Sequence, residues 1–281
     1  MKELRTRKNW VVTPLPYPPL SLKGRGEKMV ATNVFLQGNL GYNGSHQIWP
    51  KASRSSMKNE ILNSKNLQRA AEDFRYLLNR GYSRKASLEL VGNHYQLTAD
   101  HRHLLHRGVY ADLDARSRRK KKVSAKDLFD RDLAIDGHNV LITIEAGLSG
   151  RPLIHGDDGF IRDISGLSGN FKKTETTEKA IQLIIHALKN MKPRQTLFLF
   201  DAPISRSGKL AQEVRRQLRK ENLLGDALAV KVPEKFLIGF QGVIATSDTA
   251  IIDQSKKLLD LAGHILRKKT KLESLVQLDR K

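Results

Sequence analysis

The chain has 281 residues, a formal net charge of +21 at pH 7 and no cysteine. The lack of cysteine excludes disulfides, thiolate zinc sites and cysteine nucleophiles, and it fits the reducing cytoplasm where we expect the protein to reside. No run of about 18 apolar residues exists, so we predict no membrane-spanning helix. The excess of positive charge favours a polyanionic partner, with nucleic acid expected first and an anionic membrane surface second.

Residues 1–56 differ in composition from the rest of the chain. They contain both tryptophans and five of the nine prolines, and nine Lys and Arg against two Glu give them a net charge of +7. We expect a disordered basic extension. It is either a tail that touches nucleic acid or an upstream extension ahead of a start at Met57, and we slightly favour the second interpretation.

Residues 57–115 predict a small domain of three short helices. Apolar residues recur at helical spacing over residues 67–78, and Ser83 and Thr98 are candidate N-caps of the second and third helices. Three glycines are placed to end these helices: Gly81, Gly92 and Gly108. Helix-turn-helix domains share this outline with many docking modules, so contact with nucleic acid by this unit stays open.

Residues 116–130 begin with six basic residues in seven positions. They are Arg116, Arg118, Arg119, Lys120, Lys121 and Lys122. One interpretation is a solvated linker. The other is a strap that contacts phosphates and gives affinity without a choice of sequence. We predict a basic linker whose six cations bind nucleic acid.

Residues 131–281 alternate apolar runs with helical patterns. This alternation predicts an α/β domain whose parallel sheet carries helices on both faces. Three apolar runs end in Asp136, Asp201 and Asp248. Ligands bind at the carboxyl ends of such strands, so we expect these carboxylates to converge. Clustered carboxylates repel one another and need a cation, and oxygen ligands suit Mg²⁺ or Mn²⁺.

Each of these aspartates also has a structural interpretation. Asp248 precedes a helical pattern and could cap that helix, and Asp136 with Gly137 could form only a turn. Taken singly, each aspartate fits the structural interpretation better. The occurrence of all three at strand ends favours a common site.

The motifs around these aspartates resemble the PIN/NYN nuclease superfamily. Its first strand and turn are similar to residues 133–141 (LAIDGHNVL), its second strand-end acid to residues 200–201 (FD), and its later Thr-x-Asp region to residues 245–248 (ATSD) with Asp253 one turn on. The resemblance implies a ribonuclease fold dependent on Mg²⁺ or Mn²⁺. It implies that Asn139 orients the first strand-end carboxylate and that four residues bind the metal: Asp136, Asp201, Asp248 and Asp253.

The sequence departs from the nuclease pattern at two points. His138 stands where Tyr is usual. The superfamily also places a second acid soon after the first strand, and spacing does not choose among Glu145, Asp158, Asp163 and Glu178. Asp163 is marginally preferred as a further metal ligand. Residues 147–173 are rich in glycine and contain a predicted hairpin over residues 153–162, which is either a lid or a sign of missed elements.

Residues 66–266 also resemble, as a whole, an uncharacterised prokaryotic family that pairs a helical module with this α/β domain. The likeness includes residues 77–82 (LLNRGY) and residues 90–93 (LVGN). It covers more of the chain than the nuclease motifs do, and it implies no established activity.

These observations lead to one main hypothesis and two alternatives. The main hypothesis is a divalent-metal-dependent nuclease acting on RNA, in which Asp136, Asp201 and Asp248 are catalytic because they hold the metal that activates the attacking water. The first alternative is a nucleic-acid-binding protein without catalysis. The second is a scaffold protein of a ribonucleoprotein, in which the positive charge serves assembly.

Overall fold

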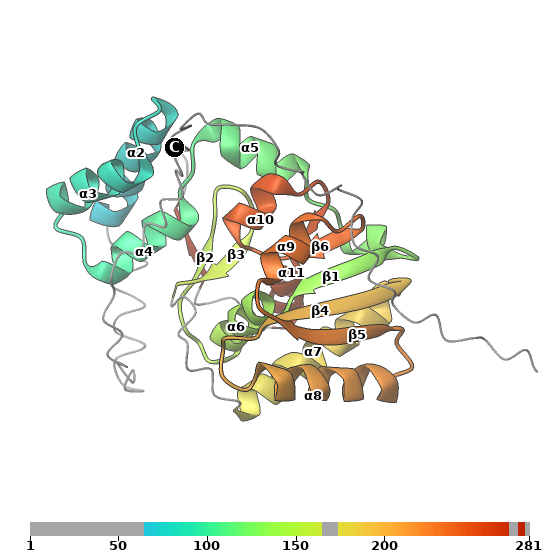
Figure 1. Cartoon of the computed structure of the whole chain (residues 1–281). Coiled ribbons are helices and arrows are strands. Elements are labelled where there is room, and N and C mark those ends of the chain that lie inside the picture. Colours follow the sequence, from blue (N-terminus) through green and yellow to red (C-terminus); the bar gives the residue numbers. More distant parts are fainter. Residues whose placement is uncertain (1–64, 165–173, 270–274, 279–281) are drawn as a thin grey trace, which may run out of the picture. The chain divides into compact units, whose positions relative to one another are not determined.

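The computed structural model describes residues 65–164, 174–269 and 275–278 (Figure 1). The predicted basic extension over residues 1–56 lies outside these ranges, as does the end of the glycine-rich segment. Within the described ranges, no helix is long and apolar enough to cross a membrane.

Four helices make up the N-terminal part of the described chain: α2 (Lys65–Asn79), α3 (Arg84–His94), α4 (Ala99–Gly108) and α5 (Asp112–Lys120). The predicted caps are confirmed, because Ser83 Oγ accepts from the Ala86 N–H and Thr98 Oγ1 from the His101 N–H, both at 3.3 Å. Gly92 does not end its helix. It lies inside α3, where a Cβ would collide with the guanidinium of Arg102.

The fourth helix was not predicted. α5 runs through the expected boundary between residues 115 and 116, so Arg116 and the next basic residues lie in a helix rather than in an extended linker. The helix ends at Lys120 and is followed by a short 3-10 helix, η1 (Ala125–Leu128).

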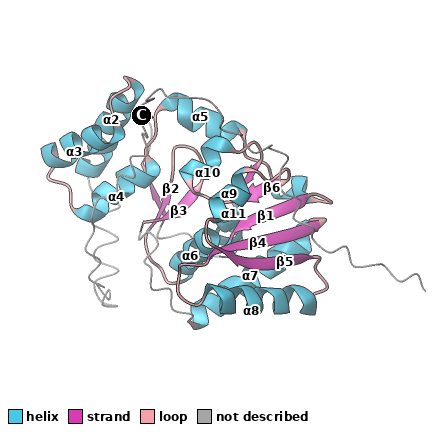
Figure 2. Cartoon of the chain, viewed as in Figure 1, coloured by secondary structure: helices cyan, strands magenta, loops and turns pink. Residues whose placement is uncertain are grey.

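The main sheet has five parallel strands in the order β5-β4-β1-β6-β7 (Figures 1 and 2). They are β1 (Asp132–Asp136), β4 (Gln195–Asp201), β5 (Gly225–Val230), β6 (Val243–Ala245) and β7 (Leu258–Leu259). The predicted parallel α/β sheet is therefore confirmed. β1 lies in the middle, between β4 and β6, and the strand order reverses there.

Helices cover both faces of this sheet (Figure 2). One face packs against α6 (Gly137–Leu148), α7 (Glu175–Met191), α8 (Ser207–Lys220) and α11 (Leu261–Lys269). The other packs against α9 (Pro233–Ile238) and α10 (Thr249–Gln254). Successive side chains of a strand point to opposite faces. Accordingly Leu133 and Ile135 enter the first core while Ala134, between them, enters the second.

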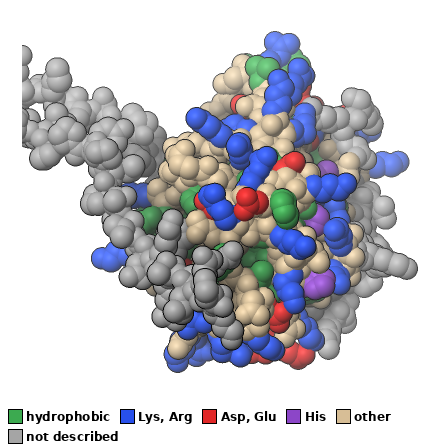
Figure 3. Space-filling view, turned by 90° about the vertical axis from the view of Figure 1, so that its right-hand side faces the viewer, with side chains coloured by type: hydrophobic (Ala, Val, Ile, Leu, Met, Phe, Trp, Pro, Cys, Tyr) green, Lys and Arg blue, Asp and Glu red, His purple; other side chains and the backbone are tan. Residues whose placement is uncertain are grey.

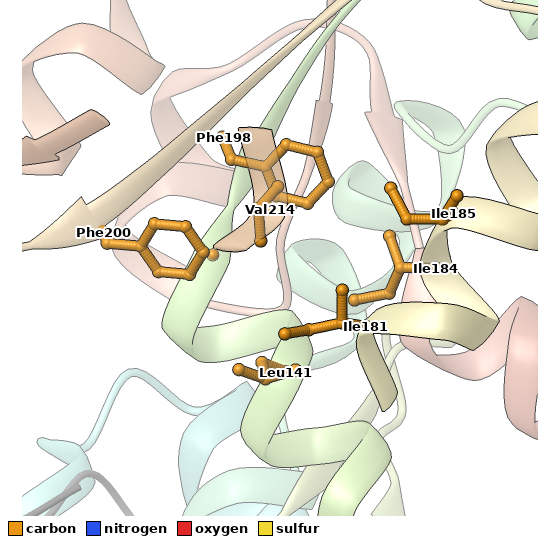
Figure 4. A pocket seen from close by; sticks show the side chains of 8 residues that line it. Leu141, Ile181, Ile184, Ile185, Phe198, Phe200 and Val214 are labelled. Atoms are coloured by element: carbon orange, nitrogen blue, oxygen red, sulfur yellow. The ribbon is translucent and has the colours of Figure 1, made fainter. Parts of the chain in front are cut away.

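The first core is closely packed. Side chains of α6, α7, α8 and β4, among them Leu141, Ile181 and Phe200, enclose a space of about 10 Å³ (Figure 4). A space of this size and apolar lining is no larger than a single water molecule needs, and it offers no polar partner. We therefore regard it as a packing defect below the carboxyl end of β1 and not as a ligand site.

A second, smaller sheet joins the two halves of the chain. β2 (Leu153–His155) and β3 (Ile161–Asp163) form the predicted hairpin, and β8 (Leu275–Gln277), which was not predicted, pairs in parallel with β2. Ile154 and Val276 of this sheet belong to the same apolar core as Phe74 and Leu104 of the helices. The helices therefore complete their core with residues from the C-terminal half.

Candidate functional site

Three aspartates lie at one edge of the five-stranded sheet. Asp136 is the last residue of β1, Asp201 is the last residue of the adjacent β4, and Asp248 follows the adjacent β6 by three residues. The charges of Asp248 and Asp201 both raise the pKa of Asp136. The three acids thus lie at the ends of adjacent strands where the strand order reverses, but among the described residues they are not grouped closely enough to form a metal site in this structure.

Asp136 is a buried carboxyl group with only 7% of the residue exposed. Burial and, less strongly, the two neighbouring carboxylates raise its pKa, while hydrogen bonds with Thr246 and the Asn139 backbone lower it, and the net pKa is about 7. The Thr246 hydroxyl donates to Asp136 Oδ2 at 2.8 Å. No Lys, Arg or His forms an ion pair with Asp136 in the described part of the chain.

Hydrogen bonds tie the loop after β6 to the start of α6. Thr246 Oγ1, which donates to Asp136, accepts from the Asp248 N–H at 3.0 Å. The side-chain oxygen of Asn139 accepts from both the backbone N–H and the hydroxyl of Ser247, each at 2.9 Å. The Asn139 side chain therefore holds this loop, whereas only its backbone reaches the carboxylate it was expected to orient.

Asp248 also has the structural role that its sequence context allowed. It is the N-cap of α10, and its Oδ1 accepts from the N–H groups of Ala250 and Ile251 at 2.8 and 3.2 Å. Both bonds use the same oxygen. Its Oδ2 has no hydrogen-bond partner among the residues described, so the cap leaves one carboxylate oxygen for another ligand.

His138 is a site residue that the sequence revealed only as a departure from a motif. Its side chain is fully buried, its Nδ1 accepts from the Asp201 N–H at 3.1 Å, and Asp201 Oδ2 lies 3.1 Å from the same nitrogen. Gly137 permits this approach, because a Cβ there would lie 2.9 Å from the Leu199 carbonyl oxygen and closer still to the Phe200 ring. In the sequence, the one feature that marks His138 is its position two residues after the strand-end acid Asp136.

Two predicted metal ligands lie in other surroundings. Asp163 ends β3 in the smaller sheet, and its Oδ1 is 3.7 Å from Arg107 Nη2. Asp253 lies on α10, where Arg118 donates to both of its oxygens at 2.6 and 2.8 Å. Arginines therefore contact both carboxylates in this structure, and the assignment of Asp163 and Asp253 as metal ligands stays a prediction.

The other candidates for a second acid are also dispersed. Glu145 is buried on α6, where burial raises its pKa and a hydrogen bond with Thr177 lowers it, whereas Glu178 lies on α7. Asp158 lies in the hairpin and is bound by arginine. Over the described ranges, no three His, Cys, Asp or Glu residues are grouped closely enough to hold a metal ion in this arrangement.

Four of the six predicted nucleic-acid-binding cations bond within the protein. Arg118 is buried and bonds to Asp158 and Asp253, and Arg119 donates to the Asp157 carbonyl. Lys121 donates to the carbonyls of residues 252 and 253 at 2.9 and 2.7 Å, and Lys122 donates to the Gly159 carbonyl. Arg116 and Lys120 are exposed. Most of these basic side chains therefore connect α5 and the residues after it to the hairpin and to α10.

We call the connected set Arg118, Arg162, Asp158 and Asp253 the arginine junction; all but the exposed Asp253 are buried. Arg162, only 2% exposed, donates to both oxygens of Asp158 at 2.8 and 2.7 Å. Its Nε also donates to the Ser247 carbonyl at 2.7 Å. The hairpin, α5 and the loop that carries Asp248 are therefore fastened by a single connected network, which sequence spacing did not reveal.

The fold and this site define a parallel α/β protein preceded by a helical module. Residues 66–121 match the family described as "Protein of unknown function (DUF434)", and residues 125–264 match the "Domain of unknown function (DUF5616)". An uncharacterized protein of Methanocaldococcus jannaschii, MJ0935, is 34% identical over 202 residues, which are 71% of this chain and 96% of that relative. The chain belongs to this family of uncharacterised proteins, as its overall resemblance indicated.

No solved structure matches the chain. The resemblance to PIN/NYN nucleases therefore stays a prediction, which depends on the strand-end motifs and on the site geometry.

Proposed function

We propose that this protein is a divalent-metal-dependent nuclease acting on RNA, with Asp136, Asp201 and Asp248 holding Mg²⁺ or Mn²⁺. The observation that carries the proposal is the buried Asp136 carboxyl group, which lies near two further carboxylates and has no basic partner in the described structure. A chain with 50 Lys and Arg could readily supply such a partner. Because Asp136 lacks a basic partner, a cation from solution would be favoured beside it.

The chemistry of the donors fits a hard divalent cation. Carboxylate oxygens from three adjacent strand ends are the ligands that Mg²⁺ and Mn²⁺ prefer. Asp248 offers the oxygen that its helix cap leaves unused, and Thr246 bonds to only one oxygen of Asp136. When bound, such a metal activates water and offsets charge on a phosphodiester.

The surrounding residues would keep these carboxylates in position. Thr246 holds Asp136, and Asn139 holds Ser247, which precedes Asp248. His138 accepts from the Asp201 backbone and lies beside its carboxylate, which restricts the end of β4. The substrate would be attracted by the positive charge of the whole chain. Figure 3 shows Lys and Arg side chains spread over one face, with fewer acidic side chains among them.

A second candidate function is binding of nucleic acid without cleavage. Two observations favour it: Asp248 already serves as a helix cap, and the described residues contain no assembled group of three metal-ligand side chains. In that case Asp136 is a protonated buried acid, and the basic surface carries the whole function. The scaffold alternative differs from this candidate only in its weaker binding of isolated RNA.

The two candidates separate in one experiment on the full chain. Cleavage of mixed-sequence single-stranded RNA is measured with Mn²⁺ and with EDTA, for the parent and for Asp136→Asn. Asp253→Asn is the matched control, since it makes the same change at an acid bound by Arg118. We expect Mn²⁺-dependent cleavage by the parent and the control, and a loss of at least about 100-fold in Asp136→Asn.

Other outcomes decide against the nuclease. Equal cleavage by the parent and Asp136→Asn would mean a contaminant or a wrong site. RNA binding by all three proteins without cleavage, and without Mn²⁺ binding by calorimetry, would establish the binding protein instead.

A further inference from the structure

A cavity of about 330 Å³ opens between the helical module and α10. Its walls include Arg84 at the start of α3, Tyr110 between α4 and α5, Arg118 of α5 and Thr249 of α10. Thr249 directly follows Asp248, so one wall residue of the cavity is adjacent in the chain to a residue of the proposed metal site. The volume falls at the lower end of the range of about 300–1,000 Å³ seen for small-molecule pockets.

The cavity contains a partly buried cation, Arg84, whose side chain forms hydrogen bonds to carbonyl groups. Arg84 has no ion pair with any described carboxylate, and its Nη2 donates instead to backbone carbonyls, at 2.5 Å to Val109 and also to His106. Burial lowers the pKa of Arg84, and the nearby charges of Arg118 and Arg162 act in the same direction, while Tyr110 and Asp158 partly offset them. Asp158 is already bonded to Arg162 and Arg118. An anion in the cavity would offset this unbalanced charge.

Aromatic groups shape the same space. The guanidinium groups of Arg84 and Arg118 lie 4.7 and 4.4 Å from the centroid of the Tyr110 ring, which orders both cations. Tyr82, another wall residue, is 61% exposed and could receive a stacked base. Burial and nearby cations lower the pKa of His106 to about 4, so that this wall residue is neutral at pH 7. Exposed aromatic rings beside arginines are typical of single-stranded nucleic-acid sites.

We propose that this cavity binds one nucleotide of the RNA strand, with its phosphate on Arg84 and its base against Tyr82. The inference rests on the proposed function in taking RNA as the ligand, and it assigns the helical module the task of holding the strand beside Asp248. Asp114, an acid on the cavity wall, weakens rather than supports phosphate binding.

The test measures binding without metal, so that it does not depend on cleavage. Fluorescence anisotropy follows a labelled single-stranded RNA of 12 nucleotides in EDTA with the full-length protein. Arg84→Gln is compared with Lys85→Gln, which removes the same charge from the next, exposed position of α3. We expect affinity to fall about tenfold in Arg84→Gln and about twofold or less in Lys85→Gln.

A second variant covers the case in which Arg84→Gln disturbs the helices. Thr249→Glu adds a negative charge to the cavity wall at the first position of α10, where an acid suits the helix dipole. We expect it to weaken binding as Arg84→Gln does, with an unchanged unfolding temperature. Affinities within twofold of the parent for both variants would overturn the proposal.

Uridine monophosphate is the probe that identifies the source of the phosphate. If uridine monophosphate bound with micromolar affinity that depended on Arg84, but RNA binding did not depend on Arg84, the cavity would be a site for a free nucleotide. This result would overturn the proposal that the cavity binds RNA. A failure of the nuclease proposal looks different, because cleavage would be absent while the binding in EDTA still depended on Arg84.

Discussion

Two buried aspartates of this protein have opposite electrostatic surroundings. Asp158 is 0% exposed; burial acts to raise its pKa, but Arg162, its hydrogen bonds and Arg118 hold the pKa below the usual value. Asp136 is buried almost as completely, and its pKa rises to about 7 because no basic residue compensates it. Burial alone therefore does not decide the charge of an acid. The partner that the fold places beside it does.

The contrast separates a structural acid from a candidate functional one. Asp158 fastens the hairpin to α5 and, through Arg162, to the loop before Asp248. The hydrogen bonds of Asp136 are to nearby residues, Thr246 in the adjacent loop and the Asn139 backbone, and not to a basic side chain. Carboxylates that remain uncompensated at a strand-order reversal are the expected form of a cation site.

The largest effect should come from removing the compensated acid. Asp158→Asn leaves Arg162 buried without its carboxylate partner, so we expect the free energy of unfolding to fall by about 3–5 kcal/mol. Urea denaturation monitored by circular dichroism measures this. Asp253→Asn is the matched control, because the Asp253 side chain is 51% exposed and its loss should cost only about 1 kcal/mol or less. Equal effects of the two substitutions would show that burial does not strengthen the junction.

A smaller effect of opposite sign is expected at Asp136 in the metal-free protein. Below about pH 4 the folded and unfolded states both carry the proton. Between about pH 4 and pH 7 the unfolded state loses this proton while the folded state keeps it, so stability falls as the pH rises, and above about pH 7 the loss is complete. Asp136→Asn removes this loss. We expect it to be more stable than the parent at pH 8 by on the order of 2–4 kcal/mol.

Urea denaturation in EDTA at pH 5 and pH 8 tests this expectation. Asp158 should show the opposite pH dependence, because its pKa is lower in the folded state than in the unfolded state. Its ionised form stabilises the fold at pH values above the unfolded-state pKa, and this stabilisation is lost as the pH falls through the folded-state pKa. If Asp136→Asn and the parent had the same stability at pH 8, the carboxyl group would not be uncompensated in solution.

The smallest effect is the stabilisation by a bound metal. At a Mn²⁺ concentration about 100 times its dissociation constant, the parent should gain about 2–3 kcal/mol, seen as a higher unfolding temperature in differential scanning fluorimetry. We expect Asp136→Asn to lose this gain and Asp253→Asn to keep it, because Arg118 already binds Asp253. A gain lost in Asp253→Asn but kept in Asp136→Asn would move the metal site from the strand ends to α10.

The sequence by itself determined the local features of the fold. Apolar runs ending in Asp136 and Asp201 became β1 and β4, and Ser83 and Thr98 became N-caps, because these signals depend on neighbouring residues. The start of α8 shows a different arrangement, in which Ser207 is the first helical residue and Arg206, with a φ of 66°, is the N-cap.

Only the tertiary structure decided which distant residues meet. Spacing in a chain with 50 basic and 29 acidic residues cannot say that Arg118 holds Asp253, that Asp163 lies in the smaller sheet, or that β8 completes the core of the helices. These pairings follow from strand order and from the burial of whole elements, which bring together residues more than 100 positions apart. The tertiary arrangement also leaves Asp136 without a basic partner among the described residues, and this property is the basis of the proposed function.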